Sequence, residues 1–311
     1  MTRSHQITEL LSPELRAELR RLHFSTRRLV TFDLVGSYRS AFRGHGIEFE
    51  EVREYAPGDE IRRIDWKVTA RRGTPYIKTY REERELSVLL ALDISGSMFT
   101  GSRQQLRSRL MAQVSALLAL IATRNNDRIG LLTFSDKIEQ FHPPARGRKP
   151  LTRILGDILL PLASGSRSNE LTSHQTSLTA VSEFILRTVR RHTIIFVISD
   201  FFSNGYQDAF AKLAHNHELV TIRCLDKLDF SLPDADLVYI RNPESGAVTL
   251  INSSSARERS VYAQQIADSR EQLKLVAQKY GFRSFELFTD EPFMPVLRRF
   301  FTSDVKQKLS V

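Results

Sequence analysis

Two aspartates that directly follow short apolar runs are the residues best suited to chemistry in this sequence. Asp93 ends the run Ser87–Asp93 and opens the stretch Asp-Ile-Ser-Gly-Ser-Met. Asp200 comes directly after the run Ile194–Ser199. Continuous apolar runs of this length are typical of strands buried on both faces of a parallel sheet. Because ligands bind at the carboxyl ends of such strands, we expect both carboxylates at one edge of the sheet.

The residue types around Asp93 favour a hard divalent cation. Two neighbouring carboxylates repel each other unless a cation or hydrogen bonds compensate their charge. Ser95 and Ser97 follow Asp93 and can add hydroxyl oxygens. Magnesium prefers oxygen ligands and keeps several waters, so the set predicts Mg²⁺, with Mn²⁺ as a substitute and one position left open. In the simpler alternative, Asp93 and Ser97 only cap the following helix.

The pattern Asp-x-Ser-x-Ser after a first buried strand resembles the metal-ion-dependent adhesion site of von Willebrand factor A domains. The resemblance implies that Ser95 and Ser97 bind the metal directly and that Asp93 and Asp200 often act through water. It also implies that a carboxylate from a partner protein fills the open position.

The same resemblance implies that a threonine in a later loop belongs to the metal site. We assign Thr176, which lies just before a predicted helix. The glycine that often precedes this threonine is absent, so Thr179 and Thr172 stay open as alternatives.

A second signature lies upstream of the two aspartates. Residues 44–67 read GHGIEFEEVREYAPGDEIRRIDWK and continue to Ala70-Arg71. This stretch resembles the domain-of-unknown-function-58 family, bacterial and archaeal proteins with a von Willebrand A-like domain. The family resemblance implies a partnership with a MoxR-type AAA+ ATPase, because members are often encoded near one. It further implies an adaptor or cofactor role in chaperone-like protein maturation or complex remodelling, and gives residues 44–72 no known role.

Apolar patterns then predict the elements that position the aspartates. From residue 86 on, predicted strands alternate with predicted helices, interrupted by a hairpin near residues 237–251. This order predicts an α/β fold with a doubly wound, mostly parallel sheet and helices on both faces, which the resemblance makes von Willebrand A-like. The predicted division is an N-terminal helical and β-rich region (1–85), the sheet domain (86–290) and a C-terminal helix (291–311).

Local patterns add detail within the N-terminal region. Leucines at spacings of three and four predict one or two helices within residues 7–30. Strands are predicted at residues 47–53 and 76–80, and Pro57-Gly58 suits a type II turn. After that turn Asp59 is predicted to cap a short helix over residues 60–66.

Composition excludes several classes of protein. The 311 residues are 41% hydrophobic and 26% charged, which is ordinary for a globular chain. The single cysteine, Cys224, excludes an internal disulfide and a cysteine zinc site. The sequence holds neither an apolar stretch of about 20 residues nor the apolar core of a secretion signal. We therefore expect a cytoplasmic protein with no membrane span.

Function is expected to be metal-dependent protein interaction, without enzymatic activity. No phosphate-binding loop or hydrolase nucleophile motif occurs. One alternative is a magnesium-dependent phosphoryl-transfer enzyme that uses Asp93, although the haloacid-dehalogenase-like pattern has a second aspartate at the position where Ser95 stands. The other is a basic nucleic-acid-binding protein. The net charge of +9 is spread along the chain instead of clustered, so no nucleic-acid partner is expected.

Overall fold

The computed structural model describes residues 29–42, 47–82, 85–100, 106–164, 176–230, 236–241 and 248–308. The chain forms two compact units: residues 42–86 make the smaller one, and the chain before and after them makes the larger one. Residues 1–28 lie outside the described residues, and with them nearly all of the helices predicted within residues 7–30. The boundaries predicted at residues 85 and 290 stay predictions.

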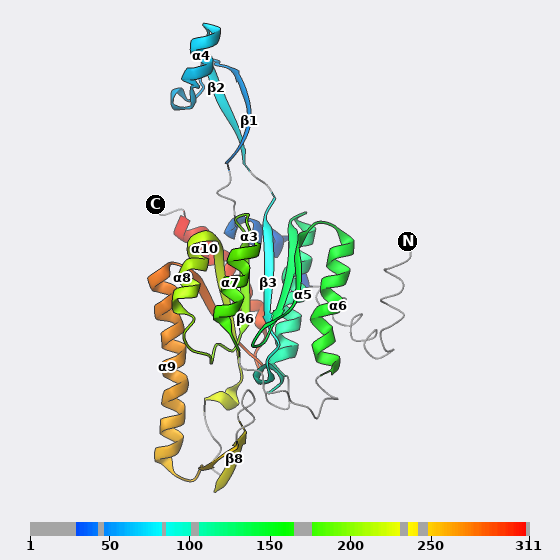
Figure 1. Ribbon diagram of the computed structural model, residues 1–311, viewed down its shortest axis with the longest axis vertical. Coiled ribbons are helices and arrows are strands. Elements are labelled where there is room, and N and C mark those ends of the chain that lie inside the picture. Colours follow the sequence, from blue (N-terminus) through cyan, green and yellow to red (C-terminus); the bar gives the residue numbers. More distant parts are fainter. Residues whose placement is uncertain are drawn as a thin grey trace. The chain divides into compact units, whose positions relative to one another are not determined.

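The larger unit is built on a six-stranded sheet in the order β10-β7-β6-β3-β4-β5 (Figure 1). Neighbouring strands are parallel except β4 and β5, which are antiparallel. The bounds are β3 Ser87–Asp93, β4 Arg128–Phe134, β5 Ile138–Ala145, β6 Ile194–Ser199, β7 Glu218–Leu225 and β10 Arg283–Phe288. The chain enters at β3, adds β4 and β5 on one side, and returns to add β6, β7 and β10 on the other. The doubly wound, mostly parallel α/β class predicted from the sequence is confirmed.

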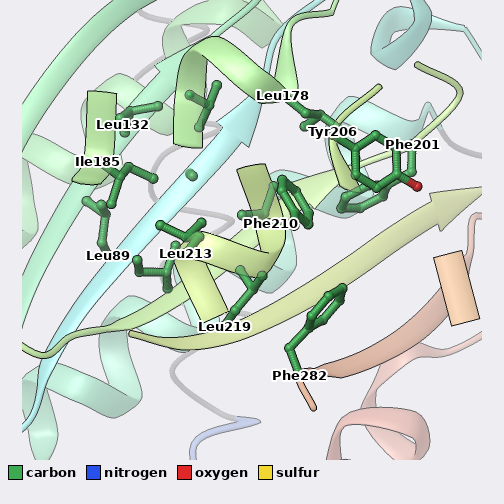
Figure 2. Packing of buried hydrophobic residues seen from close by; sticks show 14 of the residues in the cluster. Leu89, Leu132, Leu178, Ile185, Phe201, Tyr206, Phe210, Leu213, Leu219 and Phe282 are labelled. Atoms are coloured by element: carbon green, nitrogen blue, oxygen red, sulfur yellow. The ribbon is translucent and has the colours of Figure 1, made fainter. Parts of the chain in front are cut away.

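Helices cover both faces of this sheet. Their bounds are α3 Phe32–Ala41, α5 Arg107–Arg124, α6 Arg148–Ser164, α7 Leu178–Thr188, α8 Gln207–Asn216, α9 Ala256–Tyr280 and α10 Phe293–Lys308. Leu89 and Ala91 of β3 join a buried cluster with apolar residues of α7, α8 and α9 (Figure 2). The alternate residues of β3, among them Leu90, are also buried. They face the opposite side of the sheet, because side chains alternate along a strand.

An antiparallel hairpin interrupts the alternation, as predicted. It consists of β8 (Leu237–Arg241) and β9 (Val248–Asn252). Residues 242–247, which join the two strands in sequence, lie outside the described residues. Among the residues that the structure describes, none of the helices combines the length and the apolar character that crossing a bilayer requires.

The smaller unit is a two-stranded antiparallel sheet with a structured connection. Strands β1 (Ile47–Glu54) and β2 (Tyr76–Glu82) pair in the region where two strands are predicted. Between them lie a 3₁₀ turn, η1 (Ile61–Arg63), and a short helix, α4 (Trp66–Arg72).

The helix predicted over residues 60–66 is wrong in position. Ile64 has an extended backbone, so the 3₁₀ turn stops before it. The helix starts afterwards, because the Asp65 side chain accepts hydrogen bonds from the backbone amides of Lys67 and Val68. Asp59 does not cap a helix. Its carboxylate is bound by the Arg53 guanidinium at 2.6 and 2.8 Å.

Candidate metal site

The chain proceeds in opposite directions across the sheet from β3 and β6, so the topological switch point lies between these two strands. Leu92 pairs with Ile198 in the parallel register. Asp93, which ends β3, therefore lies opposite Ser199, which ends β6, and Asp200 follows directly. Open α/β sheets bind ligands outside the carboxyl ends of strands at such a point. The expected placement of the two aspartates at one edge of the sheet is confirmed, and the strand order makes their strands neighbours.

The loop after β3 folds back on Asp93. The Ser95 backbone amide donates to Asp93 Oδ1 at 2.9 Å, which closes a local aspartate turn. The 3₁₀ turn η2 (Gly96–Phe99) follows and places Ser97 Oγ 3.0 Å from Ser95 Oγ. Asp93, Ser95 and Ser97 are all buried. The spacing of this motif thus brings two hydroxyls and one carboxylate together at the strand end.

Thr176 reaches the same carboxylate from a distant part of the chain. Its hydroxyl donates to Asp93 Oδ2 at 3.3 Å. The next residue, Ser177, holds this segment: its amide donates to the Ser135 carbonyl at 3.0 Å, and its hydroxyl caps α7. Thr176 is thereby anchored between the end of β4 and the start of a helix.

The two other threonines differ from Thr176 in placement. The Thr179 hydroxyl donates to the Gly205 carbonyl at 3.3 Å and is exposed. Thr172 lies outside the described residues. Thr179 therefore provides a natural control for any role assigned to Thr176.

Ser199 is a member of the group that sequence reasoning missed. Its hydroxyl donates to Asp93 Oδ2 at 2.6 Å and accepts from the Phe201 amide at 3.1 Å. Ser199 could have been identified from its place directly before Asp200, at the end of the strand that pairs with β3. That identification requires knowing the order of the strands in the sheet, which the sequence alone does not reveal.

Asp200 carries a buried oxygen without a hydrogen bond. Asp200 Oδ1 accepts from the Phe202 amide at 3.2 Å, whereas Oδ2 is buried and has no hydrogen-bond partner among the residues that the structure describes. The whole residue is 1% exposed. An ionised carboxylate buried in this way is strongly disfavoured unless a cation or another donor compensates it.

The two carboxylates influence each other. Burial and, to a smaller extent, the negative charge of Asp200 raise the pKa of Asp93 to about 7, although hydrogen bonds from Ser199 and Ser95 oppose the rise. Without a compensating cation, the Asp93 carboxyl therefore holds a proton for part of the time at neutral pH. A divalent cation would favour the ionised form.

The donor set fits a hard cation. It consists of two carboxylates and three hydroxyls, from Asp93, Asp200, Ser95, Ser97 and Thr176. An all-oxygen donor set of this kind suits Mg²⁺ or Mn²⁺ better than zinc, which favours histidine and cysteine ligands. Within the described part of the chain, no three His, Cys, Asp or Glu side chains gather to hold a metal. A cation at this site would therefore depend on the hydroxyls.

Two buried arginines lie near the carboxylates, and sequence reasoning assigned neither of them a role. Arg107, the first residue of α5, donates to the Ser97 carbonyl at 2.8 Å and forms an ion pair with Asp229. Arg223 of β7 is fully buried, and burial lowers its pKa. Both guanidinium groups interact electrostatically with Asp200. They supply positive charge that helps to compensate its carboxylate.

Sequence comparisons identify related proteins. The family described as "Protein of unknown function DUF58" matches residues 51–272. The uncharacterized proteins Mb1516 of Mycobacterium bovis and Rv1480 of Mycobacterium tuberculosis are each 28% identical to this chain over 293 residues. Each alignment covers 94% of this chain and 90% of the relative.

Solved structures that resemble this chain in part have low sequence identity to it. The conserved hypothetical protein BatB from Bacteroides thetaiotaomicron is 15% identical, with a TM-score of 0.42 and coverage of 71% of this chain and 99% of that one. The SpRpn10 VWA domain is 10% identical, with a TM-score of 0.35 and coverage of 68% and 93%. The von Willebrand factor type A structure from Catenulispora acidiphila is 10% identical, with a TM-score of 0.37 and coverage of 74% and 44%.

Proposed function

The chain belongs to the DUF58 family of proteins of unknown function, and we propose that it is a metal-dependent protein-interaction module without enzymatic activity. The observation that carries this proposal is the buried group at the switch point. Hydroxyls of Thr176 and Ser199 and the Ser95 amide converge on Asp93, while one oxygen of Asp200 has no hydrogen bond within the described part of the chain. Such a group gains most from a cation that binds oxygen.

In this proposal Mg²⁺ or Mn²⁺ binds the hydroxyls of Ser95, Ser97 and Thr176, together with Asp93 and Asp200 directly or through water. The cation would hold the carboxylates ionised and offer a further coordination position to a partner. Two carboxylates balance the charge of a divalent ion without exceeding it, so an incoming Asp or Glu of another protein is the natural further ligand.

The family resemblance makes a MoxR-type AAA+ ATPase the first partner to test, with a client protein that offers an Asp or Glu. The chain would then act in the cytoplasm as adaptor or cofactor of the ATPase in protein maturation or complex remodelling. The ATPase would supply the nucleotide chemistry.

The test is binding of a purified MoxR-type ATPase from the same organism, in magnesium and in EDTA. Wild type and the Thr179→Val variant should bind in magnesium and lose binding in EDTA. The Thr176→Val variant should bind at least tenfold more weakly, because it lacks a metal ligand and keeps nearly the same volume. Equal binding by the two threonine variants, or full binding in EDTA, would show that docking uses another surface.

Hydrolysis assays on the same proteins separate this proposal from the phosphoryl-transfer alternative. The purified chain should turn over neither ATP nor a phosphate monoester in magnesium. Magnesium-dependent turnover that disappears in the Asp93→Asn variant would instead establish an enzyme with Asp93 in its active site.

A further inference from the structure

The segment that connects β1 to β2, residues 55–75, exposes two large apolar side chains. Ile61 is 66% exposed and Trp66 is 68% exposed. Their backbone is nevertheless ordered, because the Asp65 amide donates to the Tyr76 carbonyl at 2.8 Å and a β-bridge joins Ile64 to Ile77. At this exposure Trp66 does not belong to a core of the described residues.

The acidic side chains of this connecting segment are neutralised locally. Asp59 pairs with Arg53 at 2.6 Å. Glu60 pairs with Arg63 at 2.8 Å, and Asp65 pairs with Lys78 at 3.2 Å.

Four cations of the same segment remain without an acidic partner among the described residues. They are all exposed: Arg62, Lys67, Arg71 and Arg72. Arg72 lies over the Tyr76 ring at 5.6 Å, and because the ring is neutral this contact leaves the net charge of the segment unchanged. The connecting segment therefore combines an exposed tryptophan and isoleucine with an excess of positive charge.

We propose that the connecting segment docks on an anionic phospholipid surface, with Trp66 and Ile61 at the headgroup boundary and the four cations facing the headgroups. Tryptophan favours such boundaries because it has an apolar body and a polar N–H group. Basic side chains gain from a fluid anionic surface without needing matched ion-pair geometry. Two large apolar side chains suit shallow insertion better than a protein interface, which usually buries about 800 Å² per partner. This docking goes beyond the proposed metal-dependent function and requires no metal.

The full chain carries its own probe, because Trp66 is its one tryptophan. The wild-type chain should sediment with phosphatidylcholine vesicles that contain phosphatidylglycerol, and should not sediment with pure phosphatidylcholine vesicles. Trp66 emission should shift to shorter wavelength on binding. The partition coefficient should fall steeply with added salt.

Matched variants with two charge reversals locate the docking surface. Arg62→Glu with Arg71→Glu should weaken partitioning more than tenfold, since each cation contributes roughly a fivefold effect. Arg187→Glu with Lys274→Glu makes the same change in net charge on α7 and α9 and should partition as wild type. Because all four side chains are exposed, circular dichroism should show that both variants stay folded.

Several results would overturn the proposal. One is no binding to the anionic vesicles, and another is vesicle binding that leaves Trp66 emission unchanged. Equal losses in the two charge-reversed variants would indicate attraction by net charge alone. Absent vesicle binding, with ATPase binding lost only in the Arg62 and Arg71 variant, would assign the segment to a protein partner instead.

Discussion

Asp93 is the residue on which the proposed site depends most. Three donors bind its carboxylate, from Ser95, Thr176 and Ser199, and its pKa is raised to about 7. A raised carboxyl pKa means that the folded protein holds the proton more tightly than the unfolded chain. The carboxyl of Asp93 therefore stabilises the metal-free fold fully below pH 4, and this contribution is lost as pH rises through 7.

The first prediction follows from this loss of stability with rising pH. In EDTA, wild type should lose about 2–4 kcal/mol of unfolding free energy relative to the Asp93→Asn variant between pH 4.5 and pH 8.5. The variant keeps the shape of the side chain but does not titrate. Urea denaturation of both proteins at the two pH values measures this difference. Parallel pH dependence in the two proteins would show that the carboxyl is not perturbed.

The spacing of residues in the sequence predicted some members of the proposed metal site and missed others. Asp93, Ser95 and Ser97 could be grouped because they lie within five positions, and Asp200 because it follows a similar apolar run. Ser199 and the two buried arginines were missed. Their contacts arise from the order of the strands and the start of α5, which no local pattern states.

At the scale of elements, the start of α5 is tied to the loop after β7. Arg107 binds the Ser97 carbonyl and forms a buried ion pair with Asp229. This link holds the loop that carries Ser97 against the 3₁₀ turn η3 (Lys227–Asp229). Removing one partner of a buried pair leaves the other charge uncompensated.

The second prediction compares two arginine–carboxylate pairs. Arg107→Met should destabilise the protein by about 3–5 kcal/mol, since it leaves Asp229 buried without its partner. Arg187→Met removes an exposed pair with Glu183 and should cost less than about 1 kcal/mol. Urea denaturation gives both values, and similar costs would contradict the structural role of Arg107.

A close approach between β4 and β5 gives the third prediction. A Cβ atom on Gly130 would lie 2.7 Å from the His142 carbonyl oxygen and 2.8 Å from the Pro144 nitrogen. Gly130→Ala should therefore destabilise the protein by about 2 kcal/mol, because backbone has to move. Gly156 in α6 has no neighbour within 4 Å of such an atom, so Gly156→Ala should stabilise by about 0.5–1 kcal/mol. Thermal unfolding of the two variants should move in opposite directions, and a shared direction would contradict this packing.

The helix predicted over residues 60–66 was wrong because the sequence offers two possible caps. Asp59 and Asp65 are both suitable caps by residue type. Arg53 occupies the Asp59 carboxylate, whereas Asp65 remains available to the amides of Lys67 and Val68. The choice between the two caps depends on a partner six residues upstream on a strand, which local propensity does not include.

At the scale of the whole molecule, the alternation of strands and helices predicted the doubly wound class. It could not predict that β3 and β6 are neighbours, which is the fact that brings Asp93 to Ser199 and Asp200. The neighbouring placement depends on where the chain reverses its direction across the sheet. Each of the two units carries its own proposal: a cation site in the larger one and a lipid-docking segment in the smaller one.

Anomalous diffraction from crystals of the full chain grown with Mn²⁺ tests the central claim most directly. The proposed site predicts one strong peak beyond the carboxyl ends of β3 and β6. Oxygens of Ser95, Ser97 and Thr176 should lie about 2.1 Å from it, with Asp93 and Asp200 bound directly or through water. The peak should be absent from crystals of the Asp93→Ala variant grown in the same way. A wild-type crystal with no peak at this place, or with manganese bound at another group of residues, would contradict the account.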